Sequence, residues 1–186
     1  MNAYVDESIR RSESGIYLVA AAIVTDVDLD EARYRVRSVI GRGQPRFHWR
    51  DESEPQRRRM LEAIVELGPT AAAYVCVPTG RRQDRARALC IGRMLWDLKE
   101  LGARHVTFES RQPHNDRKDA RTIERAKRSG TAAAELRYVF QRPLDEPLLW
   151  VADALAGVAS ARMAGEPSEL FDVLPDGFLS IETLAP

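Results

Sequence analysis

The sequence predicts an α/β fold built on one mixed sheet, with an antiparallel start, a parallel continuation and helices on both faces. Two β-prone segments, residues 2–6 and 15–25, precede any convincing helical pattern, which favours an antiparallel pair at the start of the sheet. From residue 53 onward, strand and helix patterns alternate, as they do where parallel strands are covered by helices. The length of 186 residues favours a single domain, 1–186, in which residues 165–186 are a short C-terminal extension.

The first half of the chain supplies strands and their first helical cover. Residues 2–6 form a short strand, and residues 15–25 form an almost continuous apolar strand, typical of one covered on both faces. A helix over residues 53–67 is indicated by Ser53 and Gln56, which have capping-box spacing. Two further elements are expected: a short helix over residues 30–40 and an apolar strand over residues 71–77.

The second half continues with alternating helices and strands. Residues 82–101 carry an apolar stripe at helical spacing and are followed by Gly102, a common helix stop. The remaining expected elements are strands over 105–110 and 135–141, a basic helix over 115–128, a helix over 147–163 and a short amphipathic piece around 170–174. An antiparallel pair joined to parallel strands is typical of the ribonuclease H-like arrangement.

Charge and hydropathy exclude several classes of protein. The 28 basic and 28 acidic residues cancel, which argues against coating of nucleic acid by bulk attraction. The longest apolar run, residues 15–24, is shorter than the roughly 20 residues that cross a bilayer, and residues 1–10 do not resemble an export leader. Cys76 and Cys90 lie in apolar segments, as buried thiols do in a reducing compartment. We therefore expect a cytoplasmic protein that does not enter a membrane.

Three carboxylates stand next to apolar sequence. Asp6 is the last residue of the first predicted strand, Glu109 lies on a later strand, and Asp153 lies in a helical stretch, 151–157, with no other polar side chain. Burying an unpaired carboxylate costs several kcal/mol at least, so each of the three needs a partner. The structural alternatives are a turn or helix cap for Asp6, an ion pair of Glu109 with Arg111 or Arg104, and a bridge from Asp153 to a strand.

The functional interpretation is that these acids hold a divalent cation. Mg²⁺ and Mn²⁺ prefer oxygen ligands and are commonly held by a few carboxylates together with substrate phosphate oxygens. A pair of such ions, about 3.5–4 Å apart, activates water and stabilises the leaving oxygen of a phosphodiester. The predicted metal ligands are Asp6, Glu109 and Asp153, and the predicted cofactor is Mg²⁺ or Mn²⁺.

Several motifs together resemble the family catalogued as domain of unknown function 3800. Residues 4–8 (Tyr-Val-Asp-Glu-Ser), followed by the apolar stretch 15–24, resemble the opening of that family. Residues 152–157 (Ala-Asp-Ala-Leu-Ala-Gly) are similar to the Ala-Asp…Ala-Gly pattern of its last helix. Between them, residues 47–49 (Phe-His-Trp) and 106–111 (Val-Thr-Phe-Glu-Ser-Arg) look like its middle landmarks. The resemblance covers nearly the whole chain.

The resemblance implies a ribonuclease H-like fold with an acidic metal centre, in which Asp6, Glu109 and Asp153 occupy the family's acidic positions. The chain also departs from the family. Trp150 and Val151 stand where relatives often carry Gln before the helical Asp. No residue clearly matches the additional helical Glu of many ribonuclease H enzymes; the candidates for that role are Glu7, Asp51 and Asp116.

Two further polar features are candidates for substrate contacts. His48 would donate to a phosphate or pass a proton to the leaving group, or else bond a backbone carbonyl. Together with Asp51 and Glu52 it also suggests an independent metal site. The basic helix carries a line of positive charge that would follow a phosphate backbone: Arg117, Arg121 and Arg125 at four-residue spacing, with Arg128 three further on. Arg111, after the strand that precedes this helix, is a further candidate for a phosphate contact. The alternative is a solvated helix whose charges offset its own acids.

The predicted function is a metal-dependent nuclease that hydrolyses phosphodiester bonds of RNA or DNA, with Asp6, Glu109, Asp153 and His48 as catalytic residues. The alternative is a non-catalytic ribonuclease H-like module that binds nucleic acid or a protein. A third, weaker hypothesis is a phosphohydrolase acting on a small nucleotide. Apolar side chains near the C-terminus would suit an interface, including one between copies of the chain: Phe171, Leu174 and Phe178.

Overall fold

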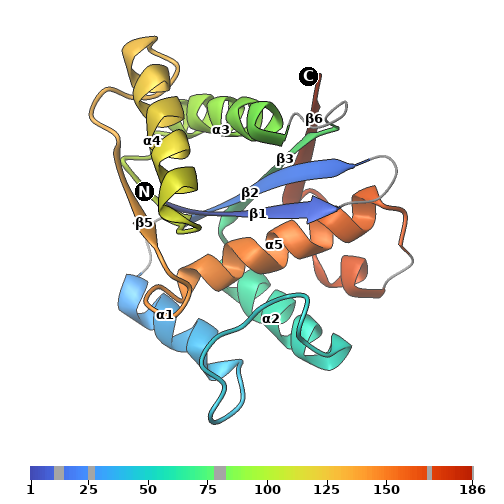
Figure 1. The fold of residues 1–186 in the computed structure, drawn as a ribbon. Coiled ribbons are helices and arrows are strands. Elements are labelled where there is room, and N and C mark those ends of the chain that lie inside the picture. The colour runs from blue at the N-terminus through green and yellow to red at the C-terminus, as the bar shows by residue number, and fades with distance from the viewer. Residues whose placement is uncertain (11–14, 25–27, 78–82, 167–168, 186) are drawn as a thin grey trace.

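A mixed sheet forms the centre of the molecule (Figure 1). The computed structural model describes residues 1–10, 15–24, 28–77, 83–166 and 169–185. Within these residues the sheet has six strands in the order β5-β4-β1-β2-β3-β6. Their bounds are β1 Asn2–Arg10, β2 Ile16–Val24, β3 Thr70–Cys76, β4 His105–Glu109, β5 Arg137–Gln141 and β6 Leu179–Leu184. β2 is antiparallel to both neighbours and every other pair is parallel, which confirms the predicted mixed sheet.

Helices cover both faces of this sheet, as predicted (Figure 1). One face carries α1 (Leu29–Ser38), α2 (Glu54–Leu67), α5 (Leu148–Met163) and the short 3-10 helix η1 (Glu169–Val173). The other face carries α3 (Gln83–Glu100) and α4 (Pro113–Arg128). None of the helices in the described ranges is long and apolar enough to cross a membrane.

α5 is the central helix of its layer and is buried over most of its length. It contacts β1 and β2 on one side and α1 and α2 on the other. A helix enclosed in this way must be apolar around its whole circumference. This explains why stretch 151–157 has no polar side chain other than Asp153.

Most element bounds differ from the predicted ones by one or two residues. The predicted strand end at Thr25 and the predicted helix start at Arg82 lie outside the described residues. The capping box of α2 is confirmed, because the backbone N–H of Ser53 donates to Gln56 Oε1 at 3.3 Å. α2 ends at Gly68, whose φ of 61° is left-handed.

The first strand is longer than predicted, and Asp6 lies within it rather than at its end. β1 continues to Arg10, with Asp6 opposite Ala20 of β2. The sequence suggested a stop because polar residues follow Val5, but the antiparallel pairing with β2 continues past them. The parallel pairing with β4, in contrast, covers only Asn2–Val5. Asp6 therefore marks the end of the β1–β4 pairing.

The last strand, β6, was not predicted. It pairs in parallel with β3 and forms one edge of the sheet. Its sequence alternates apolar Leu179 and Ile181 with polar Ser180 and Glu182, a strand signal that was available. The apolar side chains that suggested an interface are partly buried against the core on the α5 side: Phe171, Leu174 and Phe178.

Candidate active site

The topology of the sheet brings the predicted acids together. In the parallel pairing of β1 and β4, Val5 lies opposite Phe108. Asp6 and Glu109, the next residue on each strand, therefore lie side by side. α5 crosses the same face of the sheet and contacts β1, which brings Asp153 to them. These three acids and His48 line one cavity of about 510 Å³. All four residues predicted as catalytic thus face the same space.

Asp6 and Glu109 form the partly buried centre of this cavity. Burial, followed by the negative charges of Glu109 and Asp153, raises the pKa of Asp6 well above its usual range. Burial also raises the pKa of Glu109, although a side-chain hydrogen bond with Asp6 opposes that rise. The backbone N–H of Glu7 donates to Asp6 Oδ1 at 2.7 Å.

Asp153 is held from the opposite side by the chain segment that precedes α2. Its Oδ2 accepts the backbone N–H of Trp49 at 2.8 Å and lies 3.2 Å from His48 Nδ1. The hydrogen bond with Asp153, together with that residue's negative charge, raises the pKa of His48 despite partial burial. The His48 side chain remains 37% exposed and can reach a molecule in the cavity.

Close packing of Trp49 against α5 supports this arrangement. A Cβ atom added at Gly157 would lie 2.2 Å from Cγ of the Trp49 indole. Gly157 follows Asp153 by one helical turn, so the missing side chain leaves room for the indole beside the carboxylate. The sequence did not identify Trp49 as the neighbour of this turn of α5.

The donor chemistry of the cavity suits a hard divalent cation, since three carboxylates from separate elements face it. In the structure, however, these carboxylates are not arranged as the ligands of one metal ion. Among the residues that the structure describes, no group of three or more His, Cys, Asp or Glu side chains is placed to hold a metal ion. Asp6 and Glu109 are hydrogen-bonded to each other, and one oxygen of Asp153 is occupied by Trp49 and His48.

The candidates for a fourth acid have other partners or positions. Glu7 also lines the cavity, but its carboxylate pairs with Arg87 and Arg111. Asp116 accepts the Ser110 hydroxyl at 2.7 Å and the backbone N–H of Arg111 at 2.9 Å, near the start of α4. Asp51 is exposed.

The separate metal site suggested for the region around His48 is not formed either. The Glu52 carboxylate accepts the side-chain amide of Gln44 and lies 3.4 Å from the backbone nitrogen of His48. It thus holds the turn before α2 together.

The arginines predicted to bind a phosphate backbone lie in two separate places. Arg111 lines the acidic cavity, but its guanidinium is tied to Asp119 at 2.9 Å and to Glu7 at 3.4 Å, and not to Glu109. The other three arginines are exposed on α4, which covers the opposite face of the sheet from α5: Arg117, Arg121 and Arg125. Sequence reasoning missed two other cations. Arg50 lines the cavity, and the positive charge of Arg46 partly opposes the rise in the pKa values of Glu109 and His48.

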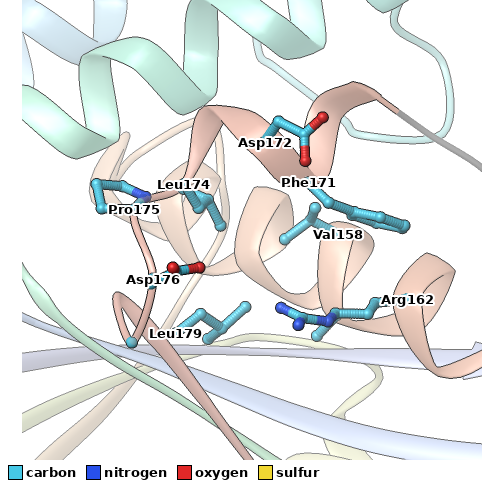
Figure 2. Close-up of a pocket in the computed structure, with 10 residues that line it drawn as sticks. Val158, Arg162, Phe171, Asp172, Leu174, Pro175, Asp176 and Leu179 are labelled. Carbon is cyan, nitrogen blue, oxygen red and sulfur yellow. The ribbon is translucent and has the colours of Figure 1, made fainter.

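A second cavity, of about 600 Å³, lies between the C-terminal half of α5, η1 and the turn before β6 (Figure 2). Its polar side chains are Arg162, Asp172 and Asp176, and its apolar walls include Phe171 and Leu174. It contains none of the predicted site residues. Its exposed acids provide matched controls for the acids of the first cavity.

Comparison with known proteins identifies the fold but no family. No family model and no curated protein matches the sequence. Among solved structures, the chain is similar to one in the structure of the PCNA:RNase HII complex from Archaeoglobus fulgidus, with a TM-score of 0.58 and 18% sequence identity. The match covers 95% of this chain and 80% of that one. With the sheet order and the mixed strand directions, this similarity shows that the chain has a ribonuclease H-like fold.

Proposed function

We propose that this protein is a metal-dependent nuclease that hydrolyses phosphodiester bonds in RNA or DNA. The observation that carries the proposal is the convergence of Asp6, Glu109 and Asp153 on one cavity, where burial and like charge hold the pKa of Asp6 high. Clustered carboxylates with raised pKa values are common at functional sites, because their repulsion is relieved when a cation binds. These three acids are the proposed ligands of Mg²⁺ or Mn²⁺.

A bound divalent cation would supply activation of water and neutralisation of charge on the phosphate. The side chains of the chain itself would orient these groups. The Trp49 N–H and His48 fix one oxygen of Asp153. The raised pKa of His48 increases its protonated fraction near neutral pH, which suits donation of a proton to the leaving oxygen.

Membership in the family catalogued as domain of unknown function 3800 is part of this proposal. It is supported by the motifs at residues 4–8 and 152–157, because both supply acids to the cavity. The ribonuclease H-like fold is consistent with nuclease chemistry, although fold alone does not imply function. Cys76 and Cys90 are buried free thiols, consistent with the expected cytoplasmic location.

A second candidate function is a ribonuclease H-like module that binds nucleic acid or a protein without cleaving it. The observation that favours it is the hydrogen bond between Asp6 and Glu109, in a described region where no three acids are placed as metal ligands. In such a module the acid pair would keep its proton and serve a structural role.

The test is cleavage of labelled RNA, DNA and hybrid duplex by wild type, Asp153→Asn and Asp172→Asn, each with Mn²⁺ and with a chelator. Asp172 is an exposed acid in the second cavity and controls for removal of one carboxylate (Figure 2). We expect wild type and Asp172→Asn to cleave only with Mn²⁺, and Asp153→Asn to be inactive while keeping its fold. Equal cleavage by Asp153→Asn would contradict the assignment, and no cleavage by any of them would favour the binding module.

A further inference from the structure

We propose that one nucleic-acid strand crosses the acidic cavity along a groove beside α5 and segment 46–57, rather than along the arginines of α4. The proposal rests on the proposed function, because it takes the substrate to be nucleic acid. A neighbouring depression of about 440 Å³ adjoins the acidic cavity. The two share four lining residues and therefore adjoin, and we take them together as the groove: Ser8, Trp49, Arg50 and Gly157.

The floor of this groove is kept low by small residues of α5. One turn beyond Asp153 the helix contributes Gly157, and after a further turn it contributes the adjacent residues Ser160 and Ala161. Phe171 of η1 lines the far end and offers an apolar surface to a base. Depressions of this size are typical of sites for small ligands, so each accommodates units of a strand rather than a whole duplex.

Cations lie where the strand would meet the acids. Arg50 is exposed at the junction of the two depressions and uses one nitrogen, Nη2, to bond the backbone carbonyl of Ile9 at 2.8 Å. A guanidinium has five N–H donors in a planar fork, so donors remain for a phosphate. Arg46 does not line either depression, but it is exposed two residues before His48, which lines the acidic cavity.

Arg57 has a supporting role in the same segment. Its Nε donates to the Trp49 carbonyl at 2.7 Å, and its guanidinium lies 5.1 Å from the centre of the Trp49 ring. These contacts hold the turn that carries Arg50. Glu54 and Glu166 also line the neighbouring depression, so they balance the charges of Arg50 and Arg57 there. We therefore expect a strand to be held by a few direct phosphate contacts and not by a broad positive field.

The α4 arginines are placed differently. Arg117, Arg121 and Arg125 are exposed on the helix that covers the other face of the sheet. Within the described ranges, none of these three side chains lines either depression of the groove. A strand bound along them would not follow the depression that leads away from Asp153.

The experiment measures binding of fluorescein-labelled 12-nucleotide single-stranded RNA and DNA by fluorescence anisotropy, in chelator, over a range of salt concentrations. The variants are Arg46→Gln and Arg50→Gln, and the matched control is a triple variant, Arg117→Gln/Arg121→Gln/Arg125→Gln. We expect each groove variant to weaken binding roughly five- to tenfold at about 0.1 M salt and to reduce the salt slope by about 1. The triple variant should bind within about twofold of wild type. RNA and DNA should respond alike, because the phosphate is common to both.

Loss of binding in the triple variant alone, or no binding by wild type, would overturn the proposal. Arg46 tests the groove even if Arg50→Gln disturbs folding through its bond to Ile9, and Arg50→Lys, which keeps the charge, should restore the salt slope. Because chelator prevents metal-dependent cleavage, the two proposals fail separately. Groove-dependent binding without cleavage in Mn²⁺ would refute the nuclease, whereas cleavage unaffected by Arg46→Gln and Arg50→Gln would refute the groove.

Discussion

Asp6 and Glu7 are neighbours in β1, yet their carboxylates have opposite surroundings. Successive side chains of a strand point to opposite faces of the sheet, so Asp6 faces α5 and Glu7 faces α3 and α4. Asp6 meets two further acids, Glu109 and Asp153, across a solvent-accessible cavity. Glu7 meets two arginines, Arg87 and Arg111, and the hydroxyl of Tyr17.

On the Glu7 side, nearly every charge is compensated. The guanidinium of Arg87 is bidentate to Asp119, with Nε–Oδ1 and Nη2–Oδ2 distances of 2.8 Å, and it also pairs with Glu7. Arg111 bonds the same two acids. This network joins β1 to α3 and α4, and its central side chains, Arg87 and Asp119, are only 8% and 5% exposed. Its role is structural.

The contrast shows how the same residue type acquires different roles on the two faces of one strand. A buried carboxylate paired with arginines stabilises a particular packing once it is formed. Carboxylates gathered without such partners destabilise the fold until a proton or cation joins them. The Asp6 side is therefore the side on which we expect chemistry, and substitutions on the two sides should have opposite effects on stability.

The largest expected effect is on the paired side. Arg87→Ala would leave Glu7 and Asp119 buried without their main partner, and we expect a loss of about 3–5 kcal/mol in the free energy of unfolding by urea. The control is Arg35→Ala, since the Arg35–Glu31 pair is exposed and its loss should leave stability close to wild type. Equal stability of the two variants would show that the Glu7 network does not hold the helices.

The next effect tests the packing that orients Asp153. In Gly157→Ala, the new methyl group would overlap the Trp49 indole, and we expect a loss of about 1–3 kcal/mol together with reduced cleavage. Gly92→Ala in α3 is the matched control, because a Cβ there meets no atom within 4 Å. That control should gain about 0.5–1 kcal/mol from helix propensity. Similar unfolding curves for the two variants would contradict the proposed Trp49 contact.

On the Asp6 side, removal of a charge should increase stability. In chelator, Asp6→Asn should raise Tm by about 2–4 °C near neutral pH, because the amide carries no charge to bury. The pKa of Asp6 is raised in the folded state, so the folded protein binds more protons than the unfolded chain and wild-type stability falls as pH rises above the usual Asp range. Thermal unfolding between pH 5 and 8 should show this fall in Tm for wild type and a weaker fall for Asp6→Asn. A lower Tm for the variant at every pH would refute the prediction that the Asp6 charge destabilises the fold.

The smallest effect concerns His48. Its pKa is raised by Asp153, so the pair contributes stability that is fully present below the usual His range near pH 6.5 and is lost as pH rises through the raised value. Because the imidazole is 37% exposed, solvent screens the pair, and we expect less than about 1 kcal/mol. Urea unfolding of wild type and His48→Gln should therefore differ more at pH 5.5 than at pH 8.5. A difference independent of pH would indicate a packing effect alone.

Much of the fold could be predicted because its signals are local. Helix α2 has a capping box at its start and a glycine at its end, and strand β2 has an unbroken apolar run. β6 could have been predicted from its alternation but is short and half-exposed. The extension of β1 past Asp6 could not, because its polar residues are stabilised by groups far away in the sequence, such as Arg87.

The candidate site divides in the same way. Asp6, Glu109 and Asp153 could be selected from the sequence because each is a carboxylate beside apolar residues, where an unpaired charge is costly. The surroundings of Arg111 could not be predicted, because its partners Glu7 and Asp119 lie on two other elements. The same holds for Trp49, whose contacts with Asp153 and Gly157 span more than 100 residues of sequence.

By itself, the sequence determined the types and approximate bounds of most elements, and the acids that require a partner. These properties follow from apolar periodicity, capping and the cost of burying charge, all of which act over a few residues. Only the tertiary structure decided that Asp6 faces other acids while Glu7 faces arginines. That outcome depends on the register of β1 against β2 and β4 and on which helix covers each face, since a shift by one residue would exchange the two side chains.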